Sequence, residues 1–254
     1  MASPAEPELT EDGLLGGRLR FFQPRRGYRA AIDPVLLAAA VRAAAGETVL
    51  DAGVGTGAAA LCLAARVPGC RVVGLEREPA SLELGAANAR ANGLADRVAL
   101  VAGDLLDPPD EIRQRSFDAV MTNPPYLAEG AGTLPLDPTR RTAHLGGAEP
   151  GRWVAACLAR LRPSGRLTLI QRTDRLDAVL AALAGRAGDA VVFPLWPSEA
   201  AAGAKRVIVS ARKAARGPLR LARGLVLHQP DGRFTPAAEA VLRDGAPLNL
   251  ASPP

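Results

Sequence analysis

The sequence contains few of the residues that bind metals or form disulfides. It has three cysteines and two histidines in 254 residues, and no pair of them has the spacing of a zinc site. Cys62, Cys70 and Cys157 lie among apolar residues, which is typical of free, buried thiols in a reducing compartment. We therefore expect reduced cysteines and no metal centre.

Long apolar stretches are also lacking. The most alanine-rich segment, residues 38–45, is far shorter than the roughly 20 residues that a membrane-spanning helix needs, and Arg42 interrupts it. Residues 1–13 are acidic and contain prolines, whereas a secretory signal starts with basic residues and continues with an apolar stretch. These features predict a cytoplasmic protein that neither spans a membrane nor is exported.

Lysine is nearly absent, although the chain is basic. Only two of the 31 basic residues are lysines, and the formal net charge is +5. A basic surplus favours an acidic partner such as RNA. The arginine excess accompanies abundant alanine, glycine and proline, a composition that a GC-rich genome also produces. Charge alone therefore does not decide between an RNA partner and genomic bias.

The order of the apolar segments predicts an α/β fold. Segments that favour strands alternate with helical ones; strands are expected at 48–51, 71–76, 98–102, 117–122, 167–171, 190–193 and 206–210, and helices at 58–66, 79–91, 152–161 and 176–183. Repeated strand–helix alternation indicates a Rossmann-like, doubly wound sheet. We expect seven strands, mostly parallel, with helices on both faces.

The predicted sheet occupies the middle of the chain. Residues 47–213 are expected to form the α/β domain, and residues 1–15 a disordered tail because they are acidic and contain prolines. Residues 16–46 should form an arm and a helix on the substrate side. Residues 214–254 should form a C-terminal extension, with a strand at 224–228 and a helix that begins at Thr235.

Two finer expectations concern helix ends and loops. The pair Asp33-Pro34 suits the start of a helix, with Asp33 as its cap, and this helix should run to about Ala45. Residues 127–150 and 196–204 lack periodicity and follow predicted strand ends. Long loops in that position usually carry function.

A glycine-rich turn follows the first predicted strand. The run from Val49 to Gly57 reads VLDAGVGTG, so Gly53, Gly55 and Gly57 lie between a strand and a helix. Glycines permit unusual backbone angles and the close approach of a ligand, and a helix N-terminus presents free amides. By itself such a turn fits a nucleotide cofactor and an ordinary tight turn about equally well.

Two acidic residues follow the next strands. Glu76 ends the strand at 71–76, 23 residues after Gly53, close to the spacing at which a carboxylate binds ribose hydroxyls. A solvated carboxylate at a strand end is the alternative. Asp104 follows the strand at 98–102, where capping a helix would be an equally ordinary role.

Four residues with a distinctive pattern directly follow the strand at 117–122; they are Asn123, Pro124, Pro125 and Tyr126. Because the carboxyl ends of parallel strands meet at one edge, this motif converges with the others where open α/β sheets bind ligands. The prolines stiffen the turn, and the Asn123 amide oxygen and the Pro124 carbonyl can each accept a hydrogen from an amino group. Tyr126 offers a face for a flat ring. The convergence disfavours the alternative, a rigid proline turn capped by asparagine.

Taken together, these motifs resemble the amino-group S-adenosylmethionine (SAM) methyltransferases. The resemblance covers about residues 49–126. It implies that the methionine part of SAM is held by Asp51, Gly53, Gly55 and Gly57. It also implies that Glu76 binds the ribose, that Asp104 and Leu105 bind the adenine, and that methyl transfer at the Asn-Pro-Pro-Tyr motif needs no metal.

The preceding segment resembles a narrower family. Residues 23–38, QPRRGYRAAIDPVLLA, are similar to the opening segment of bacterial valine-tRNA adenine-N6 methyltransferases. This resemblance, weak in the tail, implies methylation of a tRNA adenine next to the anticodon. Such a substrate needs cations for its phosphates, and the expected ones are Arg25, Arg26, Arg29, Arg140, Arg141, Lys205 and Arg206. Each could equally be a solvated surface residue.

Several alternatives stay open. Release-factor glutamine methyltransferases share the Asn-Pro-Pro-Tyr motif, but they usually carry a larger N-terminal domain than the about 45 residues that precede the first strand. Guanine-N2 methyltransferases of ribosomal RNA are commonly longer. A non-catalytic SAM- or RNA-binding module would not need Asn123 and Pro124. A NAD-dependent dehydrogenase would have no role for Asp51 or the Asn-Pro-Pro-Tyr turn.

Overall fold

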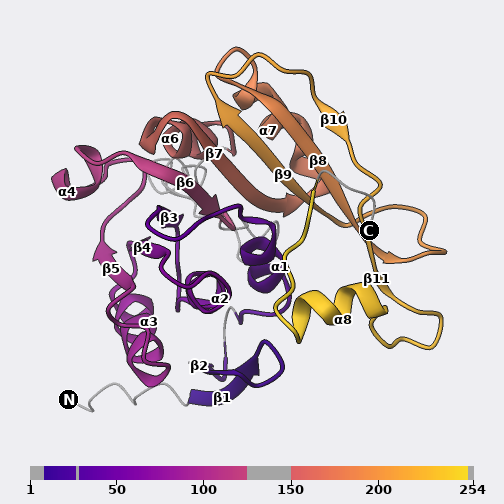
Figure 1. Ribbon diagram of the computed structural model, residues 1–254, viewed down its shortest axis with the longest axis horizontal. Helices are drawn as coiled ribbons and strands as arrows, with labels where there is room; N and C mark the ends of the chain where they lie inside the picture. Colours follow the sequence, from indigo (N-terminus) through magenta and orange to yellow (C-terminus); the bar gives the residue numbers. More distant parts are fainter. Residues whose placement is uncertain (1–8, 27–28, 125–149, 251–254) are drawn as a thin grey trace, which may run out of the picture.

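The computed structural model describes residues 9–26, 29–124 and 150–250. A large sheet runs through the molecule, and a separate hairpin lies beside it (Figure 1). The strands are β1 (Leu9–Leu14), β2 (Leu19–Pro24), β3 (Thr48–Ala52), β4 (Arg71–Glu76), β5 (Val98–Ala102), β6 (Phe117–Thr122), β7 (Leu161–Arg172), β8 (Ala187–Ser198), β9 (Arg206–Lys213), β10 (Arg220–Leu221) and β11 (Leu225–His228). The helices are α1 (Asp33–Ala40), α2 (Ala58–Arg66), α3 (Pro79–Ala91), α4 (Asp110–Arg113), α6 (Pro150–Arg160), the short 3-10 helix η1 (Thr173–Arg175), α7 (Leu176–Leu183) and α8 (Pro236–Leu242).

The strand order confirms the predicted doubly wound sheet. It is β10-β8-β9-β7-β6-β3-β4-β5, with β11 also paired to β8. The strands from β7 to β5 are parallel, and β9 runs antiparallel to both β7 and β8. The seven predicted strands form the main part of this sheet. The C-terminal extension then adds β10 and β11 to the open edge of β8, a pairing that the sequence did not predict.

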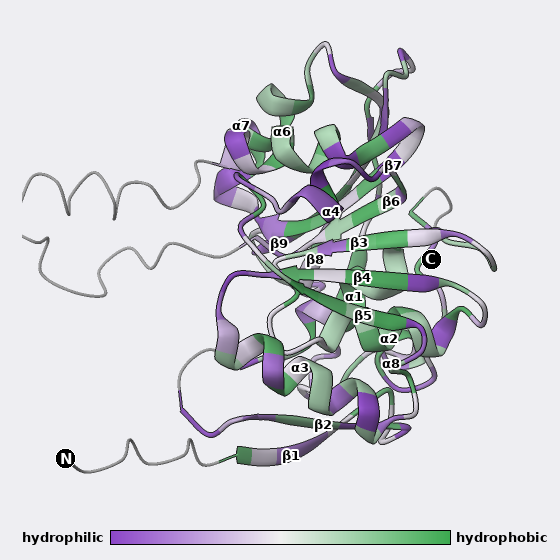
Figure 2. Ribbon diagram, turned by 90° about the vertical axis from the view of Figure 1, so that its left-hand side faces the viewer, coloured by the Kyte–Doolittle hydropathy of each residue, from purple (hydrophilic) through white to green (hydrophobic). Residues whose placement is uncertain are grey.

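Helices cover both faces of the sheet and create two separate cores. One core packs α1, α2 and α8 against the sheet, and the other packs α6 and α7 against its opposite face. Because both faces are covered, the parallel strands are apolar along most of their length. Figure 2 shows this in the hydrophobic colour of β3, β4 and β5. None of the helices in the described ranges is long and apolar enough to cross a membrane.

The hairpin of β1 and β2 corrects one prediction. Residues 1–15 were expected to be a disordered tail, yet Leu9–Leu14 pairs with Leu19–Pro24 along its whole length. Its acidic residues have basic partners, because Glu11 contacts Arg20 at 2.7 Å and Asp12 contacts Arg29 at 2.8 Å. The composition of residues 1–15 predicted disorder because composition does not show that Arg20 and Arg29, later in the chain, pair with the acidic residues. Residues 1–8 lie outside the described part.

Helix α1 differs from its prediction at both ends. Its N-cap is Ile32, and Asp33 lies inside the helix, where its carboxylate contacts Arg206 at 3.0 Å. The helix ends at Ala40 instead of about Ala45. The Arg66 guanidinium donates to the carbonyls of Ala38 and Val41. This side chain, distant in sequence, therefore satisfies the carbonyls that a longer helix would have used.

The strands on the C-terminal side are longer than predicted. Strand β7 begins at Leu161 and β9 continues to Lys213. Strand β8 extends to Ser198, into the segment that was expected to be a loop from residue 196 to residue 204. The reason is pairing, since β9 and β11 supply hydrogen bonds to a segment with weak strand propensity. Of the expected loop at 127–150, only its last residue is described, as the first residue of α6.

Candidate functional site

The carboxyl ends of β3, β4, β5 and β6 lie along one edge of the sheet, hereafter the carboxyl edge. These strands are parallel and adjacent in the order β6-β3-β4-β5. The structure therefore brings together the acidic and amide residues at their ends, which are Asp51, Glu76, Asp104 and Asn123. Open α/β sheets bind ligands at such an edge.

The glycine-rich turn after β3 is anchored to the neighbouring strand. The amides of Gly53 and Val54 both donate to the Leu75 carbonyl, at 2.9 and 3.1 Å. Gly53, Gly55 and Gly57 have φ angles of +75°, +54° and +94°, which L-residues with a side chain rarely adopt. The predicted need for glycine at these positions is therefore a backbone requirement. The turn leads into α2, whose N-cap is Gly57.

The Glu76 carboxylate is held at the mouth of this turn. One of its oxygens accepts a hydrogen bond from the Gly55 amide at 2.9 Å. The other accepts from the amides of Arg77 and Glu78, each at 3.0 Å. Glu76 is therefore a fixed part of the turn, and the alternative of a freely solvated carboxylate does not describe it.

Asp51 is a buried carboxylate with an unsatisfied oxygen. It is 2% exposed, and its Oδ2 has no hydrogen-bond partner among the described residues. Burial raises the pKa of Asp51 to about 7; the Glu76 charge adds to the rise, and a backbone hydrogen bond from Ala60 opposes it. A buried polar atom without a partner is costly. A cationic group of a ligand would satisfy this oxygen, so the site fits the ammonium of the methionine part of SAM.

Asp104 makes a local hydrogen bond at the end of β5. Its Oδ1 accepts from the Leu106 amide at 2.9 Å, in the manner of an Asx turn. Leu105 is 3% exposed and belongs to the core under α6 and α7. The Gly103 amide donates to the Glu76 carbonyl at 2.9 Å. Asp104 thus lies beside Glu76 on the carboxyl edge, and its expected role toward adenine stays a prediction.

Asn123 and Pro124 follow β6 at the carboxyl edge, where Asn123 is half-buried and Pro124 is buried. The end of β6 is tied to the end of β3, because the Thr122 hydroxyl donates to the Ala52 carbonyl at 2.7 Å. Pro125 and Tyr126, which complete the predicted motif, lie outside the described residues. The acceptor side and the glycine-rich turn are therefore joined through one buried hydrogen bond.

Trp153 on α6 packs against the ends of β3 and β6, where the Thr122 hydroxyl donates to the Ala52 carbonyl. Its Nε1 donates to the Thr122 hydroxyl at 2.9 Å, and its ring lies so close to Gly53 that a Cβ there would be 3.3 Å away. The sequence did not identify Trp153 as a residue of the site. Its position near the start of an amphipathic helix was the available signal, but that signal did not identify Thr122 as its partner.

We expect Trp153→Phe to lower the free energy of unfolding by about 1–2 kcal/mol, because the buried Thr122 hydroxyl loses a donor. Trp196→Phe is the matched control, since the Trp196 Nε1 donates to the Arg223 carbonyl in an exposed hydrogen bond. Its effect should be less than half as large. Urea unfolding of both variants measures the difference, and equal losses would show that Trp153 acts by packing alone.

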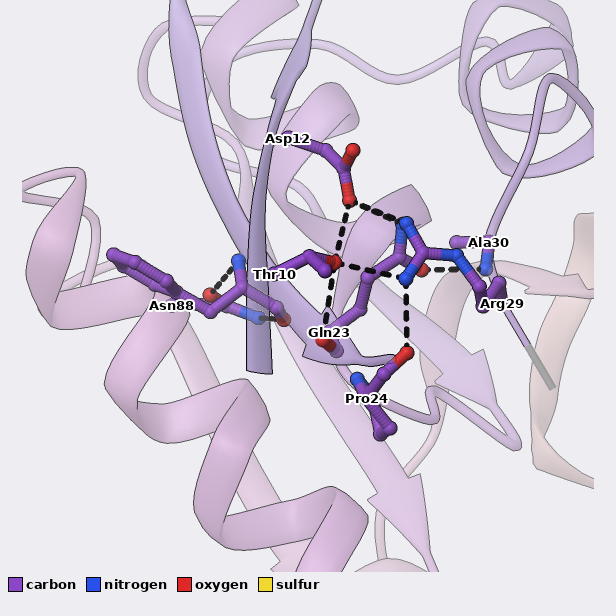
Figure 3. A network of polar contacts seen from close by, with 8 residues as sticks. Thr10, Asp12, Gln23, Pro24, Arg29, Ala30 and Asn88 are labelled. Atoms are coloured by element: carbon purple, nitrogen blue, oxygen red, sulfur yellow. Dashed lines mark hydrogen bonds and ion pairs between the residues drawn. The ribbon is translucent and has the colours of Figure 1, made fainter. Parts of the chain in front are cut away.

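Asn88 links the hairpin to the glycine-rich turn, a role that the sequence did not reveal. This side chain is fully buried on α3. Its Oδ1 accepts from the Phe22 amide at 2.8 Å, and its Nδ2 donates to the carbonyls of Phe22 and Thr56 at 2.9 and 3.0 Å. Asn88 appears beside the hairpin in Figure 3. The position of the N-terminal arm is thereby fixed relative to the turn.

Arg29 uses its guanidinium inside the arm. Nη1 donates to the Thr10 hydroxyl at 2.8 Å and to the Pro24 carbonyl at 3.0 Å, and Nη2 donates to Asp12 at 2.8 Å (Figure 3). Gln23 completes the network by donating to Asp12. These contacts make Arg29 a structural residue of the hairpin and argue against its expected role in RNA binding.

The other expected RNA contacts are placed differently. Arg25 and Arg26 are exposed after β2. Lys205 is exposed and Arg206 half-buried at the start of β9, which lies on the carboxyl edge because β9 runs antiparallel to β7. Arg206 is ion-paired with Asp33, so it also connects β9 to α1. Arg140 and Arg141 lie outside the described residues.

Within the described ranges, no cluster of histidine, cysteine, aspartate or glutamate side chains could hold a metal ion. All three cysteines are free and buried. Burial raises the pKa of the Cys62 thiol to about 12 and raises that of Cys157 as well. Neither is therefore a reactive thiolate at neutral pH.

Known proteins resemble this chain in sequence. Residues 31–137 match the family described as the methyltransferase small domain. A tRNA1(Val) (adenine(37)-N6)-methyltransferase of Aeromonas hydrophila is 30% identical over 83% of this chain and 87% of that protein. One of the same name from Porphyromonas gingivalis is 36% identical over 58% of this chain, which spans 60% of that relative. A release factor glutamine methyltransferase of Moorella thermoacetica is 37% identical over 56% of this chain and 41% of that protein.

A solved structure supports the fold. The crystal structure of a predicted O-methyltransferase, Atu636 from Agrobacterium tumefaciens, superimposes with a TM-score of 0.69 at 23% sequence identity. The match covers 82% of this chain and 94% of that one. Nearly the whole of that protein therefore shares the architecture described above.

Proposed function

The chain belongs to the family of the tRNA1(Val) (adenine(37)-N6)-methyltransferases, a SAM-dependent family, and we propose that it methylates the N6 amino group of an adenine in tRNA. One observation carries the proposal beyond the family. The unsatisfied Asp51 carboxylate and Asn123 stand at the ends of neighbouring strands, and the hydrogen bond from Thr122 to Ala52 joins those ends. The residues proposed to hold SAM and those proposed to hold the substrate amino group are therefore neighbours.

SAM, when bound, supplies a methyl group that its sulfonium activates for displacement. In the proposed complex, Asp51 and the glycine-rich turn hold the methionine part, with Asp51 as the partner of its ammonium. Glu76, which two segments of backbone hold at the mouth of the turn, binds the ribose hydroxyls. Asp104 and the Leu105 amide are proposed to bind the adenine of the cofactor.

The acceptor nitrogen needs help from the protein because its lone pair is delocalised into the ring. Asn123 Oδ1 and the Pro124 carbonyl are proposed to accept the two hydrogens of the amino group. This favours a more pyramidal nitrogen and points its lone pair at the methyl group. No strong base is needed, since the nitrogen loses its proton readily once it is methylated. Pro125 and Tyr126 are proposed to stiffen the turn and to stack on the substrate base.

The RNA would approach the carboxyl edge. Arg25, Arg26 and Lys205 are exposed. Arg140 and Arg141 follow β6 in the sequence, and β6 ends at that edge. We assign these cations to the tRNA phosphates, with Arg206 as a positioning residue. Residues 16–46 and 214–254 flank the catalytic domain, 47–213, in this proposal. A tRNA substrate agrees with a cytoplasmic location.

We expect the double variant Arg140→Gln, Arg141→Gln to bind tRNA more weakly and with a smaller salt dependence. Each lost phosphate contact should reduce the slope of log K against log salt by about 0.7–0.9. Filter binding between 50 and 200 mM salt would measure this. Arg90→Gln on the exposed surface of α3 is the control for a lost charge. An unchanged slope would remove this segment from the RNA contacts.

The proposed activity is tested by tritium transfer from labelled SAM to total tRNA from a strain that lacks this gene, followed by nucleoside analysis. Label in N6-methyladenosine is the expected result. Label that appears instead in a release factor would favour the glutamine methyltransferases, whose matched relative aligns with only 56% of this chain. Label in neither, with SAM still bound, would contradict an RNA adenine substrate.

A further inference from the structure

A cavity lies far from the carboxyl edge. It has a volume of about 400 Å³ and opens where β7 begins and β9 ends, at the opposite edge of the sheet. Four arginines line it, together with one carboxylate and one buried hydroxyl; these residues are Arg42, Arg166, Arg212, Arg220, Asp189 and Ser210. None of them takes part in the proposed methyl transfer.

The strand register forces two of these cations together. Arg166 on β7 and Arg212 on β9 are direct partners in an antiparallel pair. Like charges directly opposite each other destabilise a sheet. Asp189 offsets part of this, because its Oδ2 accepts from Arg212 at 3.0 Å. Four guanidinium groups against one carboxylate still leave three positive charges in excess around the cavity.

Arg166 is a partly buried cation of this cavity with little compensation for its charge. It is half-buried, and its guanidinium makes no hydrogen bond to the part of the chain that the structure describes. Burial, with repulsion from Arg42 and Arg212, lowers its pKa from the usual value. By contrast, Arg42 donates to the Asn249 side chain at 3.1 Å. An anion in the cavity would relieve this repulsion and supply acceptors to Arg166.

The inner wall offers a further donor. Ser210 is 2% exposed and lines the cavity two residues before Arg212. Its hydroxyl lies 3.4 Å from that of Thr168, the residue two positions after Arg166 on the paired strand. Guanidinium groups bind phosphate oxygens in pairs of hydrogen bonds, and hydroxyls add single ones.

We propose that this cavity binds a small molecule with two or three linked phosphate groups. Its volume is within the range of small-molecule sites, and the excess of three positive charges suits an oligophosphate better than a monoanion. The half-buried position of Arg166 favours a ligand that enters the cavity over a polymer that crosses its mouth.

The test uses inorganic tripolyphosphate and the full-length protein in calorimetry at low salt. Wild-type protein should bind it, and Arg166→Gln should reduce the affinity at least about tenfold, since a charge-assisted pair of hydrogen bonds is lost. Arg220→Gln, at an exposed position of β10, should reduce it several-fold and carries little risk for folding. Arg90→Gln on α3 changes the same charge away from the cavity and should bind as the wild type does.

Two outcomes would overturn the proposal. One is equal tripolyphosphate affinity in Arg166→Gln, Arg220→Gln and Arg90→Gln, which would mean non-specific attraction to a basic protein. The other is loss of tRNA affinity in Arg166→Gln without any tripolyphosphate binding to the wild type, which would assign these arginines to the RNA backbone. Because the readout is binding, it does not depend on whether the proposed methyl transfer is correct.

Discussion

Replacing Asn123 with alanine is expected to lower the turnover number by about 100- to 1,000-fold, because removing one preorganised hydrogen-bonding group from a reacting centre costs a factor of this size. The affinity for SAM should stay within about twofold of the wild-type value. The acceptor oxygen would be lost next to the amino nitrogen. The cofactor side of the site, at the ends of β3 and β4, would be unchanged. Calorimetry with SAM and a tritium-transfer assay measure the two effects separately.

Two further variants sharpen this prediction. Asn123→Asp keeps an acceptor oxygen and should recover part of the turnover. Asn92→Ala removes another asparagine side chain, one that holds the hairpin by accepting from the Arg20 amide. It should lower the melting temperature but not the turnover per folded molecule. Full activity in Asn123→Ala would exclude this residue from catalysis, even with the fold and cofactor assignment intact.

The bounds of a helix could be predicted where local sequence signals mark both of its ends. Helix α3 was predicted at its observed bounds, Pro79–Ala91, because a proline begins it and Asn92-Gly93 ends it. The end of α1 was not predictable in this way, because the Arg66 guanidinium replaces a local cap. Strand β1 was missed for the same reason, since its partners follow a turn and belong to another strand.

The same distinction applies to the candidate site. The sequence revealed four residues, each within two positions of the end of a strand, and parallel strands bring such residues to one edge; they are Asp51, Glu76, Asp104 and Asn123. The residues that support them could not be found in this way. Trp153 reaches Thr122 across 31 positions of sequence, and Arg29 satisfies acceptors on two strands of the hairpin. Such partners depend on tertiary packing, which composition and spacing do not encode.

The affinity for SAM is expected to depend on pH through Asp51. Its pKa is raised to about 7 in the folded protein, so at pH 6 most molecules carry a neutral Asp51. In the proposed complex the ammonium of SAM pairs with the Asp51 carboxylate, so SAM binding at low pH would release a proton from Asp51. We expect the dissociation constant to rise up to about tenfold for each pH unit below 7 and to be nearly constant above 8. Calorimetry from pH 5.5 to 8.5 would measure it.

Asp51→Asn should weaken SAM binding by at least about 100-fold above pH 8, because it breaks a buried ion pair, and should abolish the pH dependence. Asp96→Asn, an exposed change of the same kind, should keep both the SAM affinity and its pH dependence.

The folding stability of the free protein should change with pH in the opposite sense. Since folding raises the pKa of Asp51 from 3.8 to about 7, its stability falls as pH rises through that window. Asp51→Asn should therefore be more stable than the wild type at pH 8, and this advantage should vanish below pH 4. A variant that loses both SAM affinity and stability at pH 8 would show that Asp51 is structural and not a partner of the ligand.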